Sequence, residues 1–384
     1  MSLTSAKQAV DEFRQKNDGK VVLVLQGGGA LGAYQVGVYQ ALHEAGVEPD
    51  WIIGTSIGAI NAALIAGSKS SDRLTKLDAF WKRMQRSAAG PLAAAWPQLV
   101  DAWTSWSTLV DGIPGFFTPN LRAVWGVNMP LGARAAAFYS TAALRETLTE
   151  LVDFSILNAG SPRLTVGAAN VETSMMHYFD SRRSRITAEE IMASGALPPA
   201  FPAIAIGGQY YWDGGILSNT PTEVIFDDIP RRNSLIFAVH LWNPNGPVPQ
   251  SVWDVLHRQK DIQYSSRIAS HIVRQQQTHR LRHVISQLVR QIPPEQRNSE
   301  TVQELAGYGC KTQMHVVRLL APRIENENHT KDVDFSPSGI GMRRKAGYDA
   351  AARALQQAAW LGEFDPIEGI ILHETVAELP LAAE

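Results

Sequence analysis

The sequence predicts an α/β sandwich built on a mostly parallel sheet. Short apolar runs, the first of them "VVLVL" at 21–25, alternate along the 384 residues with segments of helical spacing. Glycine-rich turns follow the first two apolar runs, as expected for strand–turn–helix units. The composition, 45% hydrophobic and 19% charged, is typical of a globular protein with a sizeable core.

The first two strand–turn–helix units lie between residues 21 and 67. The run 21–25 is β-branched and aliphatic throughout, which is typical of a strand buried on both faces. A helix follows the glycines and ends near Gly46, with Tyr34, Val38, Ala41, Leu42 and Ala45 at helical spacing. The segment "DWIIGTSIGAINAALIAG" at 50–67 repeats the scheme, and its helix of small residues calls for close burial.

Later elements continue the alternation. Helices are predicted at 140–152 and from Thr187, where Glu190 stands at capping-box spacing. Strands are predicted at 163–173, 209–213 and 234–242. The run 314–322 has the pattern of a last strand, and 338–360 that of a closing helix.

Two regions differ in composition from this core. Residues 86–135 hold Trp96, Trp103, Trp106 and Trp125 among five prolines, which indicates an irregular cap or, alternatively, a lid that contacts lipid. We therefore expect a core at 20–248 that includes this cap, and a C-terminal extension at 249–384.

The extension contains a basic segment at 251–291 with the pattern of one or two amphipathic helices. Its apolar residues at helical spacing are Leu256, Ile262, Ile268, Ile272, Leu281, Ile285 and Leu288. A contact with anionic lipid or an acyl carrier, a solvated helix with its apolar stripe on the core, and a dimer contact all remain open.

The bulk charge and the cysteine content exclude some classes of function. A net charge of −2 gives no global field for nucleic acid, so no nucleic-acid partner is expected. The single cysteine, Cys310, cannot form an internal disulfide and fits a reducing compartment. Neither a signal-length apolar run at the N-terminus nor a stretch of about 18 apolar residues is present. We expect a cytoplasmic protein that does not span the membrane.

The stretch "QGGGALG" at 26–32, here called the glycine turn, exposes backbone N–H groups at the start of a helix and predicts a bound anion. Gly27, Gly29 and Gly32 satisfy the dinucleotide pattern G-x-G-x-x-G. That pattern also needs an acidic residue at the end of the second strand, whereas Asp50 precedes its strand. This mismatch disfavours a nucleotide cofactor, and a phosphate loop ending in Gly-Lys-Ser/Thr is absent.

The second turn, "GTSIG" at 54–58, indicates covalent catalysis instead. Ser56 lies between an apolar strand and a helix, the context of a nucleophile elbow. The glycine turn reaches the same sheet edge, so N–H groups at Gly28, Gly29 and Ala30 would stabilise an oxyanion. There are two candidates for the base: His240 at the end of a strand, and Asp213 in "DGG", where an aspartate leaves a strand into a turn.

Three ordered motifs, "QGGGALG", "GTSIG" and "ASGALPPAFPAIAIGGQYYWDGGILSNTP", resemble those of the patatin-like phospholipases from about Val21 to His240. The resemblance implies a three-layer α/β/α sandwich with Ser56 as nucleophile, Asp213 as its base without a histidine, and the backbone of Gly27, Gly28, Gly29 and Ala30 as oxyanion hole. Gly32, Gly54, Gly58, Gly214 and Gly215 belong to the same motifs, and Asn219 and Pro221 would hold the Asp213 loop.

The activity implied by the resemblance is hydrolysis of lipid acyl esters through an acyl-enzyme, without a metal or other cofactor. Acyl transfer and a non-catalytic lipid-binding role remain alternatives, and contact with a membrane surface and a homo-oligomer also remain open. The family often carries Arg or Lys where this chain has Leu31. That departure weakens the case for a phosphate headgroup at the turn; Arg182, Arg183 and Arg185 could replace the charge or could simply be solvated.

Overall fold

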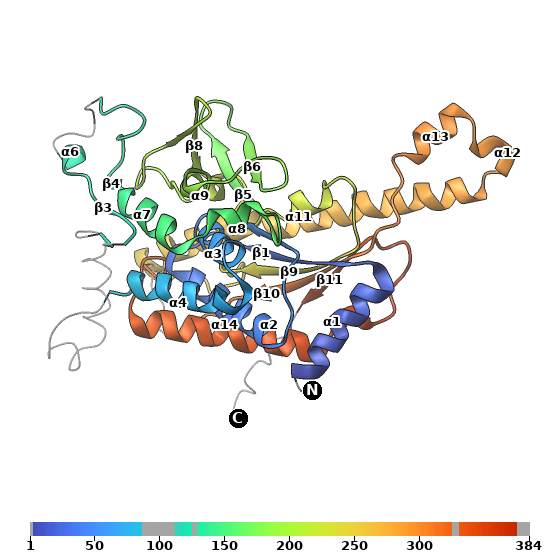
Figure 1. The fold of residues 1–384 in the computed structure, drawn as a ribbon, viewed down its shortest axis with the longest axis horizontal. Helices are drawn as coiled ribbons and strands as arrows, with labels where there is room; N and C mark the ends of the chain where they lie inside the picture. Colours follow the sequence, from blue (N-terminus) through green and yellow to red (C-terminus); the bar gives the residue numbers. More distant parts are fainter. Residues whose placement is uncertain are drawn as a thin grey trace.

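The structure is a computed structural model that describes residues 3–86, 112–113, 115–124, 128, 130–324 and 330–374. Trp96, Trp103, Trp106 and Trp125 of the predicted cap lie outside these residues. The strands and helices of the remaining chain form one layered arrangement (Figure 1).

A central sheet of nine strands organises the fold, in the order β11-β10-β9-β1-β2-β5-β8-β7, with β6 paired to β5. All neighbours from β11 to β5 are parallel, whereas β6, β8 and β7 run antiparallel to their partners. The strands are β1 (Lys20–Leu25), β2 (Trp51–Gly54), β5 (Arg163–Asn170), β6 (Met176–Asp180), β7 (Ile204–Ile206), β8 (Gln209–Asp213), β9 (Ser234–His240), β10 (Met314–Leu320) and β11 (Ile370–Glu374). A separate two-stranded sheet pairs β3 (Thr118–Pro119) with β4 (Tyr139–Ser140). The predicted mostly parallel α/β fold is confirmed.

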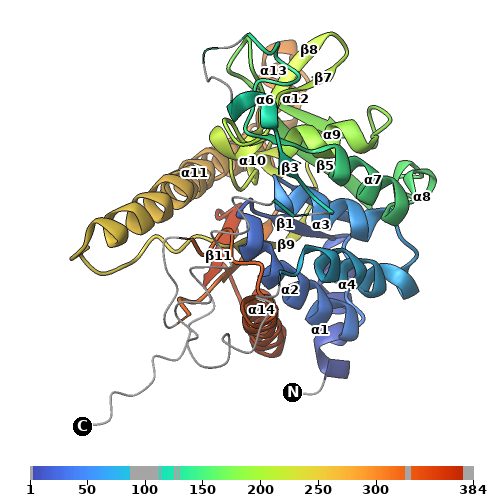
Figure 2. The ribbon, with the colours of Figure 1, turned by 90° about the vertical axis from the view of Figure 1, so that its left-hand side faces the viewer.

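Helices cover both faces of the sheet and make the three layers. The helices are α1 (Leu3–Asn17), α2 (Ala33–Glu44), α3 (Ile57–Ala66), α4 (Arg73–Met84), α6 (Leu121–Val124), α7 (Ala142–Leu151), α8 (Phe154–Asn158), α9 (Ala188–Ser194), α10 (Glu223–Phe226), α11 (Val252–Gln291), α12 (Pro294–Arg297), α13 (Glu300–Ala306) and α14 (Pro337–Gln357). Leu23 and Leu25 of β1 belong to the larger core cluster, whereas Val22 and Val24 belong to a second cluster with Phe226 of α10. α2 and α14 lie on one side of β9 and β11, and α11 lies on the other (Figure 2).

Two expectations about the C-terminal part were wrong. The run at 314–322 forms β10, but it is not the last strand, because β11 follows and pairs with it in parallel at the sheet edge. α14 is therefore a crossover helix between two parallel strands and not a closing helix, since parallel neighbours need such a connection.

The basic segment of the extension forms one helix of 40 residues, α11. Its apolar side chains Leu256, Ile262, Leu281 and Leu288 are exposed, while Asp261, Ser265, Ile272, His279 and His283 are buried. Among the described side chains the expected apolar stripe on the core is not formed: the buried ones are mainly polar, with Ile272 the exception, and the side chain of Ile268 lies outside the described residues. Across the described ranges, even α11 is not apolar enough over its length to cross a membrane.

Candidate active site

The adjacent strands β1 and β2 bring the two predicted turns together. They are parallel, with Leu25 opposite Gly54, so the glycine turn and Ser56 emerge side by side at the carboxyl edge of the sheet. Gly27 illustrates how close they are: a Cβ added there would lie 3.0 Å from Cβ of Ser56.

Ser56 occupies a strained turn between β2 and α3. Its φ of 57° and ψ of −126° lie in a region that a residue with a side chain rarely adopts, so neighbouring contacts must hold it. The Ser56 N–H donates to Oγ of Ser194 at 3.1 Å, and that hydroxyl donates to the Gly167 carbonyl at 2.6 Å. Ser194 is fully buried at the end of α9 and thus ties the turn to β5.

Close packing explains the glycines around these turns. A Cβ on Gly58 would lie 2.1 Å from the Leu25 carbonyl oxygen, which would push α3 away from β1. At the other motif glycines, Gly32, Gly54, Gly214 and Gly215, an added Cβ would meet a neighbouring atom at 2.6, 2.4, 2.5 and 2.9 Å. The glycines of these motifs are therefore required by the close packing of the loops.

Asp213 ends β8, which approaches the site from the opposite direction to β2. β8 is antiparallel to β5 and places Asp213 opposite Ala168. The Asp213 side chain is almost completely buried, and its Oδ1 accepts a hydrogen bond from the Gly215 N–H at 2.7 Å. Burial raises the pKa of Asp213 to about 6, although the Ser56 hydroxyl and the Gly215 N–H both act to lower it. The structure thus brings Ser56 and Asp213 together from two separate strands.

The backbone N–H groups of the glycine turn divide into two kinds. Those of Gly27 and Ala30 are already engaged, by the carbonyls of Asn219 at 3.3 Å and Asp332 at 2.9 Å. Those of Gly28 and Gly29, both on the cavity wall, have no partner among the described residues. The Ile57 N–H at the start of α3 is also without a partner in that part of the chain, and sequence reasoning did not single it out.

Ser56, Asp213, Gly28 and Gly29 open into one cavity of about 170 Å³. Its walls are largely apolar, and the aromatic rings of Phe117 and Phe201 have centroids 5.3 Å apart in the same wall. The side chains that give the cavity this character are Ile57, Ile60, Phe116, Phe117, Tyr139, Leu197, Phe201, Trp242, Val333 and Phe335. Such a cavity suits a hydrophobic group placed next to a hydroxyl, a carboxyl and two backbone donors.

Residues far apart in the sequence complete the cavity. Asn219 donates from Nδ2 to the Gly27 carbonyl at 3.2 Å, which joins the Asp213 loop to the glycine turn as expected. Trp242, Tyr264 and Asp332 come from beyond the three motifs, and sequence reasoning missed them along with Ser194. Ser194 lies within the third motif, which is the signal that could have pointed to it. Nothing in the local sequence of the other three distinguishes them, since their role depends on tertiary contacts.

His240, the other candidate base, lies away from this cavity. It is fully buried at the end of β9, where burial lowers its pKa to about 3, and neither ring nitrogen has a hydrogen-bond partner within the described ranges. A neutral histidine in that position belongs to the core. Arg182, Arg183 and Arg185 are exposed and are not among the residues that line the cavity.

Comparison with known proteins identifies the family to which the chain belongs. A family model of patatin-like phospholipases, which are serine hydrolases, matches residues 23–226, just over half of the chain. The chain belongs to the patatin-like phospholipase family. A second family model, described as patatin phospholipase, matches residues 262–367 in the extension.

Individual relatives match either at low identity over a long stretch or at higher identity over a short one. The chain is 27% identical over 237 residues to lysophospholipase NTE1 of Debaryomyces hansenii. The matched stretch covers 62% of this chain and 13% of that protein. It is 42% identical over 72 residues to patatin-like phospholipase domain-containing protein 6 of Homo sapiens, or 19% of this chain and 5% of that one. The chain thus spans only a small part of these curated relatives. Among solved structures, VipD from Legionella pneumophila matches with 18% identity and a TM-score of 0.39, over 88% of this chain and 67% of that chain.

Proposed function

We propose that the protein is a serine acyl hydrolase that cleaves carboxylic esters of lipid-like substrates through an acyl-enzyme on Ser56. One observation carries the proposal: Ser56, held in a strained turn, shares an apolar cavity with the buried Asp213 carboxyl and with three N–H groups, those of Gly28, Gly29 and Ile57, that have no partner among the described residues. Each of these features costs conformational or solvation free energy, and together they match the requirements of acyl transfer to a hydroxyl.

In the first half of the reaction, Oγ of Ser56 attacks the ester carbonyl carbon while Asp213 accepts its proton. The carbonyl oxygen becomes an oxyanion, which the N–H groups of Gly28, Gly29 and Ile57 stabilise. Collapse of this intermediate breaks the bond to the alkoxy oxygen, and Asp213 returns the proton to the departing alcohol. Water then attacks the acyl-enzyme by the same route and releases the carboxylic acid.

The raised pKa of Asp213 supports its role as base. A carboxylate of ordinary pKa is a weak acceptor for a hydroxyl proton, and efficiency improves as the pKa approaches the working pH. Burial raises the pKa of Asp213 to about 6 and leaves the group ionised at neutral pH. The aromatic wall and the family both favour a lipid acyl chain as the substrate group next to Ser56.

The proposal is tested with p-nitrophenyl esters of graded chain length and with phospholipids, using wild type, Ser56→Ala and Asp213→Asn. Asp180→Asn serves as a matched control, because Asp180 is also a buried carboxylate but does not line the cavity. We expect wild type and Asp180→Asn to turn over esters, and the other two variants to lose at least about 1,000-fold in kcat. Equal rates in all four proteins would refute the proposal, and ester products formed with added alcohols would indicate acyl transfer.

A further inference from the structure

The loop at 330–336, which follows β10 in the C-terminal extension, lies directly on the glycine turn. The Asp332 carbonyl accepts the hydrogen bond from the Ala30 N–H at 2.9 Å. A Cβ on Gly29, whose φ is +56°, would lie 2.3 Å from that carbonyl oxygen. Asp332 and Val333 also line the cavity. The extension therefore supplies part of the cavity wall around the N–H groups of Gly28 and Gly29.

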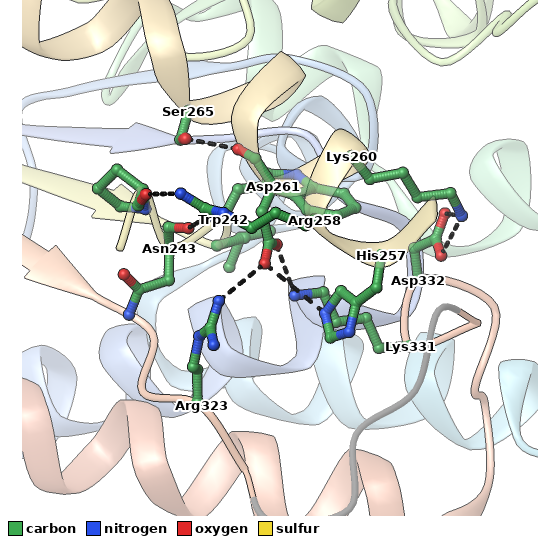
Figure 3. A network of polar contacts seen from close by, with 12 residues as sticks. Trp242, Asn243, His257, Arg258, Lys260, Asp261, Ser265, Arg323, Lys331 and Asp332 are labelled. Carbon is green, nitrogen blue, oxygen red and sulfur yellow. Dashed lines mark hydrogen bonds and ion pairs between the residues drawn. The ribbon is translucent and has the colours of Figure 1, made fainter. Parts of the chain in front are cut away.

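Two Lys-Asp dipeptides, one in α11 and one in the loop, hold the loop on the helix. The lysine of each dipeptide forms an ion pair with the aspartate of the other. Lys260 Nζ lies 2.7 Å from the Asp332 carboxylate. Lys331 Nζ lies 2.7 Å from Oδ1 of Asp261. Figure 3 shows both contacts and the helix and loop from which they come. We call these four residues the crossed ion pairs.

The two crossed ion pairs differ in burial. The Asp261 and Lys331 side chains are 1% and 5% exposed, whereas those of Lys260 and Asp332 are 38% and 23% exposed. Arg323, 3.3 Å from Asp261, and His257, 3.7 Å away, face the same carboxylate. A buried ion pair is weak evidence for stability, because apolar side chains of similar volume often serve a fold as well. Its presence here calls for another explanation.

The buried Lys331–Asp261 pair is connected to the glycine turn on both sides of Gly28 and Gly29. Lys331 lies 5.2 Å from the ring centroid of Trp242, whose Nε1 donates to the Gly27 carbonyl at 2.9 Å. The next residue, Asp332, holds Ala30. Gly28 and Gly29 are the residues between these two points of attachment.

We propose that the Lys331–Asp261 pair is a positioning device for the oxyanion hole, acting from the C-terminal extension on the backbone of Gly28 and Gly29. This inference rests on the proposed hydrolase function. An oxyanion donor that moves by about 1 Å loses much of its effect on the transition state and little of its effect on substrate binding. The pair should therefore influence kcat and leave KM nearly unchanged.

The experiment compares wild type with Lys331→Met and Asp261→Asn. Asp180→Asn is the matched control, since Asp180 forms a buried ion pair with Arg163 whose side chains are 5% and 4% exposed. The end point of fluorophosphonate labelling at Ser56 counts folded active sites, and kcat is expressed per labelled site. The third measurement is inhibition by an alkyl trifluoromethyl ketone. The Ser56 hydroxyl adds to the ketone carbonyl, and the carbonyl oxygen of the adduct becomes an oxyanion that the oxyanion hole would bind.

We expect Lys331→Met and Asp261→Asn to lose about 10- to 100-fold in kcat per labelled site, with KM within about threefold of wild type. Affinity for the ketone should fall by a similar factor, and Asp180→Asn should retain wild-type values. Should either buried variant fail to fold, Lys260→Gln removes the more exposed pair and should lower kcat and ketone affinity together by a smaller factor.

Unchanged kcat and ketone affinity in folded variants would overturn the inference, as would an equal loss in Asp180→Asn. Failure of the proposed function is a different result, because wild type itself would then show neither turnover nor labelling at Ser56. An active wild type with fully active variants overturns only the positioning role.

Discussion

Replacing the buried carboxylate of Asp213 should make the protein inactive and more stable at the same time. Burial raises the pKa of Asp213 from its ordinary value of 3.8 to about 6 in the folded protein. At 1.36 kcal/mol per pH unit, ionisation of this one group costs the folded state up to about 3 kcal/mol above pH 7. Asp213→Asn removes that cost and keeps an acceptor for the Gly215 N–H at 2.7 Å.

The sign of the effect follows from proton binding. Between pH 3.8 and about 6 the folded protein holds a proton on Asp213 that the unfolded chain has released. The contribution of Asp213 to stability therefore falls as the pH rises through this window and is constant above it. Asp213→Asn should exceed wild type by about 1 to 3 kcal/mol at pH 8 and by little at pH 4.

Urea denaturation of both proteins at several pH values measures this difference, and Asp180→Asn provides a control of opposite sign. Burial acts to raise the pKa of Asp180, but hydrogen bonds from Arg163, the Arg182 N–H and Thr165, together with the charge of Arg163, outweigh burial and lower it. Asp180→Asn should therefore destabilise the protein at pH 8, by an amount that shrinks as the pH falls through the lowered pKa of Asp180. An Asp213→Asn variant no more stable than wild type at pH 8 would refute the reasoning.

Three further predictions concern the same site. The kcat/KM of wild type should fall tenfold per pH unit below about 6, where Asp213 becomes protonated, and a pH profile that is flat from 4 to 8 would contradict this. Gly29→Ala should lower kcat and cost about 1–3 kcal/mol of stability, because φ is +56° and the new Cβ would lie 2.3 Å from the Asp332 carbonyl oxygen; wild-type kinetics and urea midpoint would disprove it. Ser194→Ala should lower kcat about tenfold by freeing the Ser56 N–H, and a Ser194→Thr variant, which keeps the hydroxyl, should retain more activity.

The parts of the fold that the sequence predicts are those set by local pattern. The apolar runs of β1 and β2, the glycine turn and the Ser56 turn all lie within some 40 residues, and parallel pairing of neighbouring strands follows from the alternation with helices. The Thr187 and Glu190 capping box at the start of α9 is confirmed for the same reason. The sequence prediction lacks β7, although the Gly207-Gly208 pair, with positive φ at both residues, is a typical turn for the hairpin that β7 forms with β8.

The parts that sequence reasoning missed depend on contacts between distant segments. Ser194 lies in the third motif, but its role becomes evident only from its hydrogen bonds with Ser56 and Gly167. Asp332 reaches Ala30 across 302 positions, and its carbonyl, not its side chain, makes the contact. The helix α11 does not follow its apolar pattern, because described apolar residues such as Leu281 and Leu288 are exposed while Asp261 and His279 are buried.

Mass spectrometry of the protein quenched in acid during turnover of a slow p-nitrophenyl ester tests the central claim most directly. The account predicts a covalent acyl group on the peptide that contains Ser56, present in wild type and absent in Ser56→Ala. Turnover with an unmodified Ser56 peptide, or with the acyl group on another residue, would contradict it.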